Sequence, residues 1–231
     1  MPFSIRKNPK KIAICGTGSG WENLPIRSEH TIYCLNDFIF MDKYQIEPDI
    51  LFIMDILDEK PKILSGTDNL GEIVSKINKL GCLFISPCRY AEIPKSQAFP
   101  LEEAVEKFGT PYFSNTIAYM TCYALLQGAK EIEFFGVNQA GSHEYTEEKG
   151  SVEYWIGIAV GMGVKVTING KDSQLLKHKG RYHSEGILYG YLTSYEGYLR
   201  DKTRFGEGVI KRLSLPTPKV ARVAWRVNHE S

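Results

Sequence analysis

The segment that decides the fold is KIAICGTGSG, residues 11–20, in which a short apolar run is followed at once by a loop with three glycines. A strand buried in a parallel sheet has this appearance, because helices cover both of its faces and leave no polar side. Most of the other short apolar runs also stop at small or polar residues; they cover residues 31–35, 50–54, 82–85, 132–135 and 164–168. We therefore predict six strands of a mostly parallel sheet.

Helical spacing of apolar residues separates several of these runs. It covers residues 70–80, 115–127 and 152–159, and Ser114 and Ser151 are the predicted N-caps of the last two helices. Alternating strands and helices imply right-handed crossovers and helices on both faces of the sheet. The predicted fold class is α/β: a Rossmann-like nucleotide-binding domain over residues 1–170. A small C-terminal extension over residues 171–231 would serve as a lid, an oligomer contact or an acceptor platform.

Composition narrows the class of protein. The 231 residues carry 28 Lys and Arg against 27 Asp and Glu, a net charge of +1, and 43% of them are hydrophobic. This is globular composition, and it gives no general attraction to nucleic acid or to an anionic membrane. The five cysteines lie in apolar stretches without a CxxC pair, which predicts buried free thiols. No stretch approaches the roughly 18 apolar residues of a membrane span, so we expect a cytoplasmic protein.

Ligands of open α/β sheets bind beyond the carboxyl ends of the strands. Five strand-end positions are therefore expected to share one crevice: the 16–20 loop, Asn36-Asp37, Asp55, Ser86 and the 136–149 segment.

The glycine loop is the strongest of these motifs. Gly16, Thr17, Gly18 and Ser19 are predicted to hold a phosphate through backbone N–H groups and hydroxyls. The alternative is a tight strand-to-helix turn without a ligand. The loop has no P-loop lysine, and Trp21 replaces the third glycine of the dinucleotide fingerprint.

Two further polar positions are binding candidates. Asn36 offers an amide donor and a carbonyl acceptor that suit a nucleobase edge or a ribose, with Asp37 beside it; the alternative is an Asx turn. Asn115 and Thr116 open a predicted helix, where they either cap it or contact a second phosphate or a sugar.

Acid–base groups are dense in residues 138–149. His143 is the predicted general base, because its titration range suits that role, and Glu144 is its nearest rival. The alternative is a solvated loop without a function. His143 and His183 are too isolated to form a metal-ligand set, so no metal site is predicted.

The pattern resembles bacterial family 42 sialyltransferases over roughly residues 11–170. The shared features are a strand with Gly-x-Gly-Ser, a strand ending Cys-x-Asn at Asn36, and Ser114-Asn115-Thr116 before an apolar helix. They also include Gly-Ala-Lys-Glu-Ile and Gly-Val-Asn at residues 128–138. Residues 144–155 also resemble uncharacterised bacteriophage proteins of the wider glycosyltransferase-like and motility-accessory group. Asn138 replaces the family's aspartate, and His143 is displaced from the place of the family's histidine.

The resemblance implies a metal-independent glycosyltransferase that needs no cofactor beyond its nucleotide-sugar donor and acts on a hydroxyl acceptor. The glycine loop would hold phosphate and Asn36 the nucleoside, while Tyr145 and Tyr154 would donate hydrogen bonds to the departing phosphate. One alternative is a pyrophosphokinase with a divalent metal at Asp37 and Asp55. Another is a protein that binds or sequesters nucleotides without catalysis.

The acceptor is not identified by these motifs. The basic tail over residues 200–226 leaves a modified nucleic-acid base open as the acceptor, but a solvated or oligomer-contacting tail is the favoured interpretation. A homo-oligomer is likewise left open.

Overall fold

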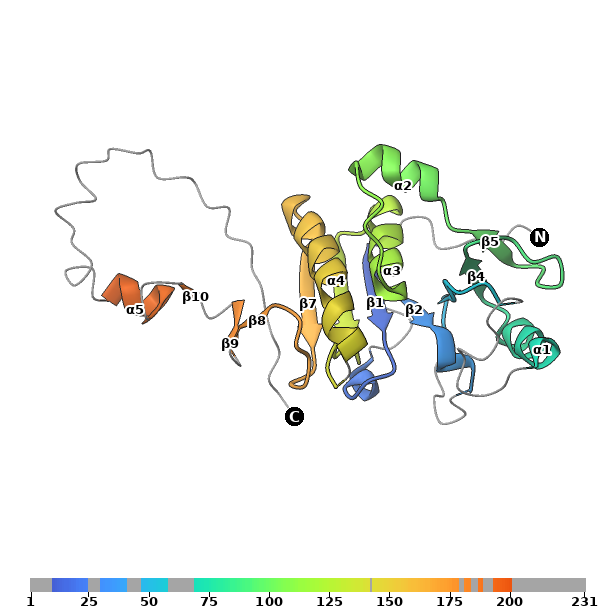
Figure 1. The fold of residues 1–231 in the computed structure, drawn as a ribbon, viewed down its shortest axis with the longest axis horizontal. Helices are drawn as coiled ribbons and strands as arrows, with labels where there is room; N and C mark the ends of the chain where they lie inside the picture. Colours follow the sequence, from blue (N-terminus) through green and yellow to red (C-terminus); the bar gives the residue numbers. More distant parts are fainter. Residues whose placement is uncertain are drawn as a thin grey trace.

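The computed structural model describes residues 10–24, 30–40, 47–57, 69–141, 143–178, 181–183, 187–188 and 193–200. Its centre is a seven-stranded parallel sheet in the order β5-β4-β3-β2-β1-β6-β7 (Figure 1). The strands are β1 (Lys11–Cys15), β2 (Thr31–Leu35), β3 (Ile50–Phe52), β4 (Leu83–Ser86), β5 (Ser96–Ala98), β6 (Glu131–Phe135) and β7 (Lys165–Asn169). The predicted α/β, Rossmann-like sheet is confirmed. The short edge strand β5 is an addition that no apolar run predicted.

The strand order reverses beside β1. Strands β2 to β5 follow one another to one side of β1, whereas β6 and β7 lie on the other side. In register, Cys15 is paired with Cys34 of β2 and with Phe135 of β6. The connections that leave β1 and β6 therefore diverge, which opens a crevice above the carboxyl ends of these two strands.

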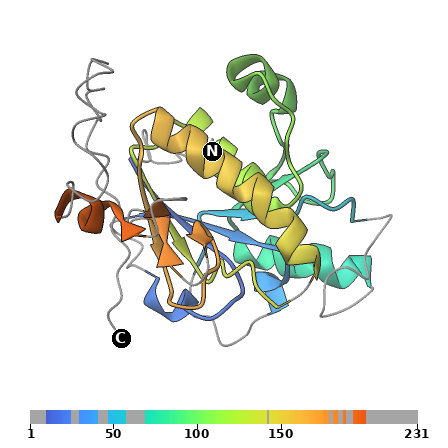
Figure 2. The same cartoon turned by 60° about the vertical axis from the view of Figure 1, so that its left-hand side comes forward.

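Helices cover both faces of the sheet. The helices are α1 (Leu70–Leu80), α2 (Leu101–Phe108), α3 (Thr116–Leu126) and α4 (His143–Gly161), with short 3₁₀ turns η1 (Trp21–Asn23) and η2 (Asn36–Phe40). Ile12 and Ile14 of β1 face the layer of α3 and α4, and Ala13 and Cys15 face the layer of α1 and η2. This alternation explains why the strand is apolar throughout. Figure 2 shows α4 and α1 on opposite sides of the sheet.

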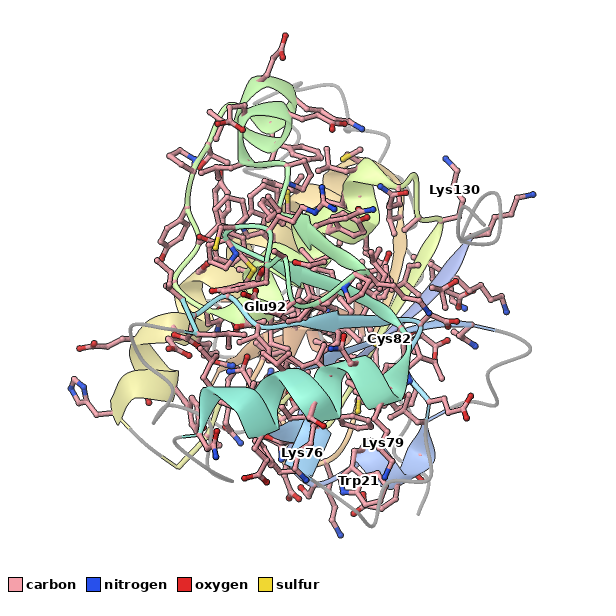
Figure 3. The ribbon with its side chains drawn as sticks, turned by 90° about the vertical axis from the view of Figure 1, so that its right-hand side faces the viewer. Trp21, Lys76, Lys79, Cys82, Glu92 and Lys130 are labelled. Atoms are coloured by element: carbon pink, nitrogen blue, oxygen red, sulfur yellow. The ribbon has the colours of Figure 1, made fainter. Side chains whose placement is uncertain are left out.

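Helix α1 shows how local sequence sets an element. Asn69 caps it by accepting from the N–H groups of Gly71 and Glu72 at 3.0 and 3.3 Å, and Gly81 ends it at a φ of 64°. Ile73 and Ile77 are its buried residues. Figure 3 views the molecule from the side of this helix, and Lys76 Nζ lies 5.2 Å from the centroid of the Phe40 ring of η2.

Both predicted serine caps are wrong. Asn115, not Ser114, caps α3: its Oδ1 accepts from the N–H of Ala118 at 3.0 Å. Helix α4 begins at His143, so Ser151 lies inside the helix and is fully buried. The charged first half of α4 has no apolar periodicity, which is why the sequence indicated a loop there.

The cysteine prediction holds for four residues and fails for one. Cys15, Cys34, Cys82 and Cys122 are free and buried, whereas Cys88 is free and exposed in the turn after β4. Burial raises the pKa of the Cys82 thiol to about 11 and that of Cys122 to about 12.

The chain beyond β7 at first stays against the domain. Ser173 Oγ donates to the Val137 carbonyl at 2.9 Å, the Gln174 N–H donates to the Asn138 carbonyl at 2.7 Å, and Leu175 is buried. The last described elements are two short hairpins and a helix: β8 (Lys177–His178), β9 (Arg181–Tyr182), β10 (Ile187–Leu188), β11 (Thr193–Ser194) and α5 (Tyr195–Arg200). Nearly all of the predicted basic tail lies outside the described residues. No described helix is both long and apolar enough to cross a membrane.

Candidate functional site

A cleft of about 880 Å³ lies over the carboxyl ends of the central strands, at the point where the strand order reverses. Its walls come from the loops after β1, β2, β3 and β6, from the start of α3 and from the first turns of α4. The described lining residues are Gly16, Thr17, Gly18, Leu35, Asn36, Met54, Asp55, Phe113, Ser114, Asn115, Thr116, Ile117, Tyr119, Gly136, Val137, Asn138, Gln139, Ala140, Tyr145 and Glu148.

Four of the five predicted strand-end positions contribute to this cleft. The glycine loop, Asn36, Asp55 and the segment after β6 all line it. Ser86 is the exception: it is fully buried and its hydroxyl donates to the Cys88 carbonyl at 2.5 Å.

The glycine loop packs against the loop after β6. The Gly16 N–H donates to the Phe135 carbonyl at 2.8 Å, and the Gly18 N–H donates to the Gly136 carbonyl at 2.9 Å. A Cβ atom on Gly16 would lie 2.4 Å from the Gly136 oxygen. The glycines therefore allow two backbones to approach each other, and the N–H groups of Gly16 and Gly18 are already used.

The rest of that loop is hydrogen-bonded to the segments after β6 and β7 and to η1. Ser19 Oγ donates to Asp172 Oδ2 at 2.7 Å and accepts from Asn138 Nδ2 at 2.9 Å. The Gly20 N–H donates to Glu22 Oε2 at 2.9 Å. Ser19 is predicted to bind phosphate, but its described contacts are to protein groups, and it is not among the lining residues.

Two residues of the cleft have a left-handed backbone. Asn36 has a φ of 40° and Gln139 a φ of 49°. The Oδ1 atom of Asn36 and the Oε1 atom of Gln139 are buried without a hydrogen-bond partner among the described residues. Strained backbone and unsatisfied polar atoms both occur preferentially at functional sites. The side chain of Asp37, the neighbour of Asn36, lies outside the described part of the chain.

The start of α3 faces the cleft. Besides capping the helix, Asn115 donates from Nδ2 to Glu148 Oε2 at 3.4 Å, and Ser114 Oγ donates to the Glu148 carbonyl at 3.2 Å. Thr116 and Ile117 line the cleft beside them. The first N–H groups of a helix have no partner within the helix and carry partial positive charge, so this end of α3 suits an anion.

An aromatic wall closes one side of the cleft. The Phe113 ring lies between two nearly parallel rings, with its centroid 4.2 Å from that of Tyr119 and 4.9 Å from that of Trp155. Burial raises the pKa of the Tyr119 hydroxyl. Sequence reasoning missed Phe113 and Tyr119, because no glycine motif or strand end singles them out. Gln139 and Glu148 lie in the predicted 136–149 segment, but no role was predicted for either of them.

The charged residues of the described lining are the acids Asp55 and Glu148. Within the described ranges, no group of three or more His, Cys, Asp or Glu side chains is arranged to hold a metal ion. An anionic ligand in this cleft would therefore be bound by backbone N–H groups, hydroxyls and amides.

The predicted catalytic residues lie in different surroundings on α4. His143 is 88% exposed, and its Nδ1 lies 3.3 Å from Glu147 Oε1, outside the described cleft lining. Glu144 has a side chain outside the described part of the chain. Tyr145 lines the cleft, whereas Tyr154 packs against Tyr112 beyond its described lining. The roles of His143, Glu144 and Tyr154 stay predictions.

Comparison with protein-family models and with curated proteins finds no match. Two matching solved structures are both of the sialyltransferase CstII from Campylobacter jejuni. One, in complex with the substrate analogue CMP-3FNeuAc, is 16% identical over 68% of this chain and 79% of that chain, with a TM-score of 0.47. The other, in complex with cytidine-5'-monophosphate, is 18% identical over 84% of this chain and 99% of that chain, also with a TM-score of 0.47. The likeness concerns the fold alone.

Proposed function

We propose that this chain is a glycosyltransferase that holds a nucleotide-sugar donor in the strand-end cleft and passes the sugar to a hydroxyl acceptor. The observation that carries the proposal is the cleft itself, which lies at the switch point of the sheet beside the start of α3. Ligand pockets have volumes of about 300–1,000 Å³, and ligands of open α/β sheets bind at this place.

The donor's phosphate is best supported at the start of α3. The Ala118 N–H already donates to the Asn115 side chain, so the remaining N–H groups of the first helical turn and the Thr116 hydroxyl are the donors for an anion there. The glycine loop forms the neighbouring wall, but Gly16 and Gly18 already donate to backbone carbonyls. We therefore propose that the glycine loop shapes the cleft and that the start of α3 binds the charged phosphate.

The nucleoside is assigned to Asn36, with the Phe113–Tyr119 wall as an apolar surface of the same cleft. The unpartnered Oδ1 of Asn36 suits a ribose hydroxyl or a base amino group. A hydrogen bond from such a ligand group would satisfy the Asn36 Oδ1 atom, which otherwise stays buried without a partner at a cost in free energy.

Transfer requires a proton acceptor for the attacking hydroxyl and a donor for the leaving phosphate. Tyr145 lines the cleft and is assigned to the leaving phosphate. Glu148 also lines the cleft, so we propose it as a base beside the predicted His143 and Glu144. If Glu148 is the base, Glu148→Gln lowers turnover by about 100-fold or more while His143→Ala does not; the reverse result assigns the base to His143.

Binding of nucleotide sugars tests the proposal directly. Isothermal calorimetry with CMP-, UDP- and GDP-sugars should give measurable affinity for at least one donor. Asn36→Gly, which keeps the left-handed backbone and removes the amide, should weaken that affinity at least tenfold. Glu72→Gln on α1 is the control, because its carboxylate pairs with Lys76 away from the cleft. Failure of all three classes to bind refutes the proposal.

The same assay separates the alternative functions. A metal-independent transferase keeps its turnover in EDTA, whereas a pyrophosphokinase requires Mg²⁺. Asp55 and Glu148 are the described cleft carboxylates that would bind such an ion. Binding without turnover of any donor would instead indicate a nucleotide-sequestering protein.

A further inference from the structure

The segment after β7, residues 170–174, contacts the loops that follow two other strands, and we name it the β7 arm. In the sheet, β6 lies between β7 and β1, so the arm begins two strands away from β1. Ser173 Oγ donates to the Val137 carbonyl in the loop after β6 at 2.9 Å. Asp172 Oδ2 accepts from Ser19 Oγ in the glycine loop at 2.7 Å. The arm therefore connects the ends of β1, β6 and β7, beside the cleft.

The hydrogen bonds that join Asp172, Ser19 and Asn138 can run in one direction only. An ionised carboxylate accepts hydrogen bonds and donates none, so the single hydroxyl proton of Ser19 is used on Asp172. The Ser19 oxygen then accepts from its other neighbour, and that donor is Asn138 Nδ2 at 2.9 Å. Without the carboxylate, Ser19 would be free to donate to Asn138 Oδ1 instead. Asp172 therefore decides which end of the Asn138 amide faces Ser19.

The rest of Asn138 is closely surrounded as well. A Cβ atom on Gly18 would lie 2.7 Å from Asn138 Nδ2, so the amide lies directly against the backbone of the glycine loop. The Asn138 carbonyl accepts from the Gln174 N–H of the β7 arm at 2.7 Å. The arm therefore holds the backbone of Asn138 directly and its side chain through Ser19.

The oxygen of the same amide has no partner. Asn138 lines the cleft, and its Oδ1 atom is buried without a hydrogen bond among the described residues. Buried acceptors without a partner are rare in native proteins, so one at a cleft indicates a donor group that a ligand supplies. An acceptor oxygen repels the oxygens of a phosphate. Asn138 therefore suits a hydroxyl or amino group of the ligand.

We infer that Asp172 is a positioning residue, which acts through Ser19 to hold the Asn138 amide with its oxygen available to a hydroxyl or amino group of the ligand. Asp172 is not among the described lining residues of the cleft, so it acts on the ligand only through this relay. The inference rests on the proposed function, because it takes the ligand to be the nucleotide-sugar donor. It adds a residue of the C-terminal segment to the machinery of the cleft.

Side-chain NMR on the ligand-free full chain tests the orientation of the amide without any donor. In the wild type, the Nδ2 protons of Asn138 should show a nuclear Overhauser effect to the β-protons of Ser19, because Nδ2 faces Oγ. Asp172→Ala should lose about half of this effect or more, since the amide then takes both orientations. Asp172→Glu keeps a carboxylate at an exposed position and should retain the effect.

Calorimetry with the CMP-, UDP- and GDP-sugars tests the consequence for binding. Asp172→Ala should weaken the affinity for a bound donor at least about twofold, because half or more of the molecules hold the amide reversed. Ser19→Ala should have a similar effect, and the double variant should lose no more than either single variant, since both remove one relay. Asp172→Glu should retain the affinity, as should the control Glu72→Gln on α1. The urea midpoint should stay unchanged, because the Ser19–Asp172 hydrogen bond is exposed.

The two measurements separate this inference from the proposed function. A reduced Overhauser effect together with weaker donor binding in Asp172→Ala supports both. A reduced Overhauser effect in a protein that binds no nucleotide sugar supports the positioning role of Asp172 and refutes the transferase. An unchanged Overhauser effect in Asp172→Ala, or unchanged affinity for a donor that the wild type binds, overturns the inference. So does a double variant whose loss is the product of the two single losses, or a urea midpoint that falls with the affinity, since a merely structural role would then explain the result.

Discussion

Substitution of Gly16 by alanine tests how the glycine loop works. The added Cβ would lie 2.4 Å from the Gly136 oxygen and 3.2 Å from a methyl group of Val137. Real Cβ atoms essentially never approach a heavy atom within 3.0 Å, so backbone has to move by roughly 0.6 Å. That movement strains the hydrogen bond from the Gly16 N–H to the Phe135 carbonyl.

We expect Gly16→Ala to lower the free energy of unfolding by about 3 kcal/mol, the upper end for overpacking, because backbone and not a flexible side chain stands in the way. For a domain of this size that corresponds to a fall in Tm of about 6–12 °C. Differential scanning calorimetry measures it.

Gly157→Ala is the matched control. Gly157 lies in α4 with nothing within 4 Å of its added Cβ, so alanine there should raise stability by about 0.5–1 kcal/mol through helix propensity. The same chemical change thus has opposite signs at the two positions. If Gly16→Ala instead kept its Tm and lost only nucleotide affinity, the glycines would serve ligand approach and the packing argument would be wrong.

Three further outcomes follow from the contacts described. Ser151→Ala removes the hydroxyl that accepts from the Ser114 N–H at 3.1 Å, and it should lower the free energy of unfolding in urea by about 1–3 kcal/mol. An unchanged urea midpoint would contradict this contact. Asn115→Ala removes the cap of α3 and should lower the free energy of unfolding by about 1 kcal/mol. Asn115→Ser can still cap the helix and should keep most of that stability. Equal stability of the alanine and serine variants would exclude the cap. The raised pKa values of Cys82 and Cys122 mean that the native thiols stay protonated while unfolded ones ionise above about pH 9. The free energy of unfolding should therefore fall between pH 9 and 11, by up to about 1.4 kcal/mol per pH unit for each thiol. The fall should be smaller in Cys122→Ala, which lacks one of the two thiols. A free energy of unfolding that does not change over this pH range would refute the burial of these thiols.

Short apolar runs determine the sheet because burial on both faces is a local property of a strand. β1 is recognisable in residues 11–15 because every side chain after Lys11 is buried, whichever face it points to. The crevice is also predictable, since parallel strands all end at the same edge. For this reason Gly16, Asn36 and Asp55 were found from the sequence.

The walls of the site depend on contacts between distant segments. Ser19 and Asn138 are 119 residues apart, and Phe113 meets Trp155 only after α4 has packed beside α3. The first half of α4 forms a helix without an apolar stripe, so its sequence resembles a polar loop. The tertiary fold brings Glu148 into the cleft and leaves His143 outside the described lining. Apolar periodicity in the sequence indicates whether a residue is buried, but tertiary packing determines which side chains contact one another.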